Sequence, residues 1–122
     1  MKFIATLCLL VLSGCASQQE IKTTTLQKEV APNIWSGHKE LTVSVESCAS
    51  KGVSILESLG FKSVVKNGHY VYGNYKDHKN YSHNRAAIKC VSVANVTFVY
   101  AAVAGPKVEL VETLRNEIIW QL

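Results

Sequence analysis

The feature that most constrains the fold is an apolar segment near the C-terminus, residues 96–103. Phe98 and Tyr100 would point to one face of a strand built from it, and the apolar residues between them to the other. A strand that is apolar on both faces is usually central in its sheet or covers a partner layer. Gly105-Pro106 follows and ends the strand. The segment therefore predicts a sheet with at least one further layer packed on it.

The rest of the chain supplies the other elements of such a fold. Ser47 is a suitable N-cap for a helix that Gly60 ends, and Asn67-Gly68 is a strong hairpin signal. The predicted elements are a strand at 41–46, a helix at 48–59, strands at 62–66, 69–75, 85–91 and 96–103, and a helix at 107–120. This order, β-α-β-β-β-β-α, predicts an α+β two-layer sandwich, an antiparallel sheet with two helices on one face.

The N-terminus has the layout of a bacterial export signal. Met1-Lys2 gives a charged start, residues 3–12 form an apolar core, and small residues precede Cys15. The stretch Leu12-Ser13-Gly14-Cys15 resembles the lipobox of bacterial lipoproteins. The resemblance implies that residues 1–14 are a signal peptide and that Cys15, bearing a diacylglycerol and an acyl chain, becomes the first mature residue. The competing interpretation is an ordinary signal cleaved near Ala16, which would release a soluble protein.

Removing residues 1–14 from the 122 leaves 108, enough for one small domain. Residues 15–40 are mostly polar and contain the breakers Pro32 and Gly37, so we expect a flexible tether there. Docking of Ile34 and Trp35 onto the domain would shorten that tether. Residues 41–122 are expected to form the folded domain, with its core.

Cysteine usage predicts one disulfide in this domain. Of the four cysteines, Cys8 leaves with the signal peptide and Cys15 carries the lipid, so Cys48 and Cys90 remain. An even number of cysteines in an exported chain favours a disulfide between them. The alternative is a pair of free thiols or metal ligands, but there is no C-x-x-C motif to support it.

Short motifs in the domain carry a second resemblance. They are Leu59-Gly60-Phe61, Tyr72-Gly73, Ala87-Ile88-Lys89-Cys90 and Val103-Ala104-Gly105-Pro106. Together with a cysteine that opens a helix, they make most of residues 41–122 similar to small exported bacterial domains of unknown function. The resemblance implies the fold and a disulfide, and it brings no activity with it.

Basic and aromatic residues are concentrated between residues 62 and 89. Six cations, Lys62, Lys66, Lys76, Lys79, Arg85 and Lys89, stand there against Asp77 alone. Tyrosine offers a large contact area at low entropic cost, and basic segments attract anionic partners. The predicted partner-binding residues are Tyr70, Tyr72, Tyr75, Lys76, Lys79 and Arg85. The competing interpretation is a solvated hairpin whose tyrosines only pack across strands.

Other chemistries lack a recognisable motif. Asp77, His78 and His83 could contribute to a metal site, but their spacing matches no compact site, so we expect no metal. The sequence has no G-x-S-x-G motif and no paired acids that would flank a cleft, so we expect no catalysis. We also expect no nucleic-acid binding and no cofactor other than the lipid on Cys15.

These observations predict a non-catalytic envelope lipoprotein whose periplasmic domain binds another envelope protein, as an immunity-type inhibitor or an accessory subunit would. The alternative is a structural lipoprotein that associates with itself through residues 96–103. Ala16 after the lipidated cysteine resembles the sorting pattern for the outer membrane. We therefore expect an outer-membrane anchor with the domain in the periplasm. Inner-membrane retention and surface exposure are the other possibilities.

Overall fold

The computed structural model describes residues 31–79 and 82–122. Its elements in chain order are β1 (Asn33–Leu41), α1 (Val45–Ser58), β2 (Lys62–Asn67), β3 (Tyr70–Lys76), β4 (His83–Val93), β5 (Val96–Gly105) and α2 (Val108–Gln121). The strands form one antiparallel sheet in the order β1-β5-β4-β3-β2. The α+β class and the order β-α-β-β-β-β-α are confirmed. The predicted signal peptide, Cys15 and the first part of the tether lie outside the described residues.

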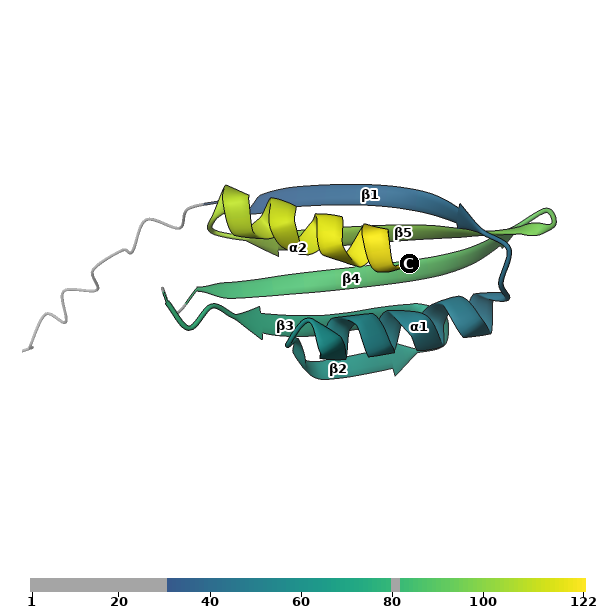
Figure 1. Cartoon of the computed structure of the whole chain (residues 1–122), viewed down its shortest axis with the longest axis horizontal. Helices are drawn as coiled ribbons and strands as arrows, with labels where there is room; N and C mark the ends of the chain where they lie inside the picture. The colour runs from purple at the N-terminus through teal and green to yellow at the C-terminus, as the bar shows by residue number, and fades with distance from the viewer. Residues whose placement is uncertain (1–30, 80–81) are drawn as a thin grey trace, which may run out of the picture.

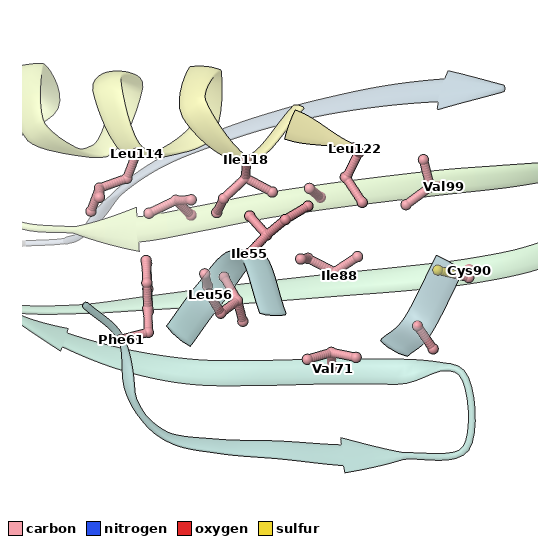
Figure 2. Close-up of a cluster of buried hydrophobic side chains, with 14 of the residues drawn as sticks. Ile55, Leu56, Phe61, Val71, Ile88, Cys90, Val99, Leu114, Ile118 and Leu122 are labelled. Atoms are coloured by element: carbon pink, nitrogen blue, oxygen red, sulfur yellow. The ribbon is translucent and has the colours of Figure 1, made fainter. Parts of the chain in front are cut away.

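Both helices pack on the same face of the sheet (Figure 1). Helix α1 lies against β2, β3 and β4, whereas α2 lies against β1 and β5. The core fills the space between the helices and the sheet (Figure 2). Its largest fully buried side chains are Leu56, Ile88, Ile118, Val71, Val99, Val103 and Val111. The predicted two-layer sandwich is confirmed.

The N-terminal part of the domain differs from the prediction. Strand β1 runs from Asn33 to Leu41 and pairs with β5 over its whole length. It therefore lies almost entirely in the stretch expected to be tether, and the folded domain starts before residue 41. Gly37 disfavours a strand locally, but a Cβ there would lie only 3.0 Å from Ile119 Cγ1 of α2. The close approach of α2 explains why glycine stands in this strand.

The first helix also begins earlier than predicted. Alternation at residues 41–46 suggested a strand, with Ser47 as the N-cap of the following helix. In the structure Ser44 is the N-cap, and its hydroxyl accepts a hydrogen bond from the Ser47 backbone N–H at 3.1 Å. The Thr97 hydroxyl of β5 donates to the Val43 carbonyl and holds the connection between β1 and α1. The Ser44 cap and this tertiary hydrogen bond determine where α1 begins. The alternation of apolar and polar residues alone could not predict that position.

The predicted hairpins are present, with the first turn shifted by one residue. Asn67 pairs with Tyr70, so Gly68 and His69 form the two-residue loop between β2 and β3. Only Gly68 of these two has a positive φ, at 60°, as a type II′ turn requires at its first central position. The turn between β4 and β5 is at Ala94-Asn95, where it was expected.

The predicted disulfide is present. Cys48 in the first turn of α1 is bonded to Cys90 of β4, with an Sγ–Sγ distance of 2.03 Å. Both cysteines are buried in the core, and Figure 2 shows Cys90 between the two layers. The bond therefore joins the helix layer to the sheet layer covalently.

Candidate functional site

The candidate site lies on the face of the sheet that no described helix covers, which we call the open face. Along β5, Thr97, Val99 and Ala101 face the helices, so the residues between them face the other way. The open face includes Ile34, Ser36, His38 and Glu40 of β1, Tyr70, Tyr72 and Asn74 of β3, Arg85, Ala87, Lys89 and Val91 of β4, and Phe98, Tyr100, Ala102 and Ala104 of β5.

The open face contains a hollow of about 550 Å³, which we call the alanine hollow. It is lined by Ile34, Tyr70, Tyr72, Arg85, Ala86, Ala87, Ala102 and Ala104. The strand register explains it, because Ala87 stands opposite Ala102, and Ala104 stands opposite both Arg85 and Ile34. Small methyl groups on the two central strands thus lie between larger side chains on their neighbours. The volume falls in the range of pockets that accept a bulky side chain or a small ligand.

Arg85 and Tyr72 form the polar part of this hollow. The Arg85 Cζ atom lies 5.4 Å from the centre of the Tyr72 ring, within the range of a cation–π interaction. Tyr70 packs beside Tyr72 with ring centroids 5.5 Å apart. Among the described residues, no carboxylate forms an ion pair with Arg85. The guanidinium is therefore held against an aromatic ring with its donors available to an anion.

Apolar surface continues from the hollow along β4 and β5. Phe98 stacks on His38 with ring centroids 5.3 Å apart and an interplanar angle of 24°. Tyr100 and Val91 beside them are 45% and 40% exposed. Contiguous exposed apolar area of this kind marks interaction sites more often than scattered surface residues do.

Charge is divided between the two faces of the domain. The helices carry Glu46 and Glu57 on α1 and Glu109, Glu112 and Glu117 on α2, against Lys51 on α1 and Arg115 on α2. The open face carries Arg85 and Lys89, with Lys76 at its end, against Glu40 alone. The open face thus carries a net positive charge and the two helices a net negative one.

The structure brings together half of the residues predicted to bind a partner. Tyr70, Tyr72 and Arg85 meet at the alanine hollow. Tyr75 lies on the opposite side of β3 and packs against Phe61 of the core, with ring centroids 5.4 Å apart. Lys76 ends β3, and Lys79 lies in the following loop, where its backbone N–H donates to Asp77 Oδ1 at 3.1 Å. These two lysines are outside the hollow.

Sequence reasoning missed the alanines of the hollow. Ala102 and Ala104 alternate on β5, and Ala87 has the same outward parity on β4. This pattern of small outward residues was a signal, but only the register between the strands shows that the three are neighbours. Ile34 was also missed, since it lay in the predicted tether.

A second concave surface lies between the helices. It has a volume of about 510 Å³ and is lined by Lys51, Ser54, Ile55, Ser58, Trp120 and Gln121. Trp120 is 79% exposed, more than any other large apolar side chain of the described residues. Lys51 Nζ donates to the Leu122 carbonyl at 3.0 Å, which ties the two helices together at this end.

A polar contact also lies at the start of α1. His69 Nε2 lies 3.2 Å from Glu46 Oε1 across the start of α1. A backbone hydrogen bond at this helix terminus lowers the pKa of the Glu46 carboxyl, and the contact with His69 lowers it further.

Within residues 31–79 and 82–122, no group of three or more His, Cys, Asp or Glu side chains is placed to hold a metal ion. No helix in the described part of the chain is long and apolar enough to cross a membrane.

Comparison with known proteins adds little to this description. No family model matches the chain, and no curated protein sequence matches it. Among solved structures, the crystal structure of Ara h 8.0201 is similar to 72% of this chain and to 95% of its own, with 8% sequence identity and a TM-score of 0.35. A likeness at that TM-score carries no argument about this protein.

Proposed function

We propose that the protein is a non-catalytic envelope lipoprotein whose domain binds another protein through the open face. The observation that carries this proposal is the alanine hollow, where Arg85 rests on Tyr72 beside exposed apolar surface. Aromatic residues and arginine are enriched in protein interfaces, and a hollow bordered by them suits the anchor side chain of a partner. An immunity-type inhibitor or an accessory subunit of an envelope complex would use such a surface.

The cellular setting of this proposal comes from the sequence. The lipobox-like Leu12-Ser13-Gly14-Cys15 supports a lipid anchor on Cys15, and Ala16 supports outer-membrane sorting with the domain in the periplasm. In that compartment the Cys48–Cys90 disulfide is stable. The proposal includes no metal, no nucleic acid and no cofactor other than the lipid.

Self-association is the second candidate function, and one observation favours it. The segment that is apolar on both faces, residues 96–103, forms most of β5. Its inner residues are buried, whereas Phe98, Tyr100 and Ala102 stand on the open face. A second copy of the chain and a different protein are equally able to cover these residues. The two candidates therefore use the same surface and differ in what occupies it.

Site-specific photocrosslinking in native envelopes tests the proposal. A photoreactive amino acid replacing Tyr100 is expected to give one discrete protein adduct, whereas the same group replacing Asn95 in the β4–β5 turn gives none. Arg85→Glu should abolish the adduct, because it reverses the charge at the hollow. Lys79→Glu makes the same charge change in the loop outside the hollow and should leave the adduct in place. An adduct that survives Arg85→Glu, or none from Tyr100, would contradict binding through this face.

A further inference from the structure

We propose that the occupant of the alanine hollow is Trp120 of a second copy of this chain, accompanied by Glu117 of that copy. The proposal deepens the self-association candidate: it rests on the open face being the binding surface, and it names a second copy as the occupant of that surface. Three features of the structure carry it: an exposed aromatic side chain, a hollow that fits it, and opposite charges around the two.

The exposed aromatic side chain is near the end of α2. Trp120 is 79% exposed, and Glu117 is exposed three residues before it, so the two are neighbours on the helix surface. Leaving a tryptophan in water is unfavourable, and tryptophan is among the residues that most often dominate interfaces. Trp120 with Glu117 thus forms an aromatic projection with a carboxylate beside it.

The alanine hollow is complementary to this projection. Its floor of Ala87, Ala102 and Ala104 provides apolar contact for a ring, and its volume of about 550 Å³ has room for an indole. Arg85 at the hollow has no carboxylate partner among the described residues. The Glu117 carboxylate of an incoming copy would supply one, and a charge-assisted hydrogen bond of this kind is stronger than a neutral one.

The wider charge pattern favours this arrangement over the symmetric one. The helices carry five glutamates against Lys51 and Arg115, so contact between the helices of one copy and the basic open face of the next brings opposite net charges together. Two open faces placed against each other would instead bring two positively charged surfaces together, each carrying Arg85 and Lys89. Like charges at an interface are costly, so face-to-face pairing is disfavoured.

The proposed contact is head-to-tail. Trp120 is in the helix layer and the hollow is on the opposite side of the sheet, so one copy cannot fill its own hollow. Each copy therefore offers one projection and one hollow, and repeated contacts build a ring or an open chain.

Light scattering and sedimentation of residues 16–122, which keep every described element, test the contact. We expect the mass to rise with protein concentration and the association to weaken when salt increases. Trp120→Ser and Arg85→Glu should each weaken association at least about tenfold. Val108→Ser, which removes another exposed apolar side chain from α2, and Lys79→Glu are the matched controls and should leave it unchanged.

A mixing experiment tests whether the projection of one copy contacts the hollow of another. Ala102→Phe fills the hollow and leaves the projection, whereas Trp120→Ser removes the projection and leaves the hollow. Each variant alone should be monomeric, and an equal mixture should form a one-to-one dimer and nothing larger. Ala102 points away from the core and Trp120 is exposed, so both variants should keep the urea midpoint of the wild type, which verifies folding.

Two results would overturn the inference, and they bear differently on the proposed function. Association that persists in Trp120→Ser, or a mixture that stays monomeric, would exclude Trp120 as the occupant. A strictly monomeric wild-type protein that still gives the Arg85-dependent adduct of a different protein would also exclude it, while leaving binding through the open face intact. A monomeric wild-type protein that also gives no adduct from Tyr100 would reject both proposals.

Discussion

At the scale of single residues, two hairpin turns place a residue in the left-handed backbone region, one a glycine and the other an alanine. Gly68 has a φ of 60° and Ala94 a φ of 52°, each in a hairpin turn. Glycine adopts this region at no steric cost, whereas an L-residue with a Cβ does so at roughly 1–2 kcal/mol. Ala94 therefore carries backbone strain that Gly68 does not.

Exchanging these residue types should change stability in opposite directions. Ala94→Gly should raise the free energy of unfolding by about 0.5–1 kcal/mol, because relief of strain exceeds the added entropy of the unfolded chain. Gly68→Ala should lower it by about 1 kcal/mol, and no atom within 4 Å of the new Cβ adds a clash. Urea unfolding measures both. A change in the free energy of unfolding in the same direction for both variants would contradict this prediction.

The sequence pattern could identify only some of the site residues, for a physical reason. Strand parity places Tyr70 and Tyr72 on one face and Tyr75 on the other, so alternation alone could have removed Tyr75 from the predicted set. Arg85 was identifiable as a cation without an acidic neighbour in sequence. Its meeting with Ala104 depends on pairing between β4 and β5, which short-range patterns do not encode.

At the scale of elements, the sequence predicted the strands and helices that have strong local signals. The hairpins, β5 and both helices were found because turn residues, caps and apolar periodicity are local properties. Strand β1 was not found, since its residues Ser36, Gly37 and Lys39 have little strand propensity. It forms because β5 pairs with it on one side and α2 packs on it.

The N-terminus of α1 should make stability depend on acid pH. The folded-state pKa of Glu46 lies below its ordinary value of 4.5, because a backbone hydrogen bond and then His69 favour the carboxylate. A lowered pKa stabilises the fold above pH 4.5, and this contribution disappears as the pH falls through the folded-state pKa. Glu46→Gln should therefore be less stable than the wild type at pH 7 and equal to it in stronger acid.

Urea midpoints from pH 7 down to about pH 3 measure that difference. Glu57→Gln is the control, since it removes the same charge from the last turn of α1, where a negative charge is unfavourable to the helix dipole. It should not be less stable than the wild type at neutral pH. If the stability difference between Glu46→Gln and the wild type grew in acid, the predicted direction of the pH dependence would be wrong.

At the scale of the whole molecule, the disulfide stabilises a domain with a small core. It connects Cys48 and Cys90 across a sequence separation of 42 and joins the two layers. In the chain-entropy model a loop of this length contributes about 4 kcal/mol, by restricting the unfolded chain. Small exported domains commonly depend on such a bond because their apolar cores are limited.

Replacing both cysteines should reveal that contribution. Cys48→Ala with Cys90→Ala is expected to lower the free energy of unfolding by about 3–4 kcal/mol, measured by urea unfolding. The wild-type protein unfolded in the presence of a reductant is the control and should reach a similar value. A loss below about 1 kcal/mol would mean that the unfolded chain is already restricted without the bond.

The sheet order also has a consequence for the sequence of assembly. Strand β1 is the first of the described strands, and among them it pairs with β5 alone, with Asn33 opposite Gly105. During synthesis β1 therefore emerges long before its partner, and pairings across such separations form slowly. Helix α1 and strands β2–β4 are complete earlier and already contain both cysteines. The covalent link can thus close around a three-stranded intermediate, with the addition of β5, α2 and β1 as the last step of folding.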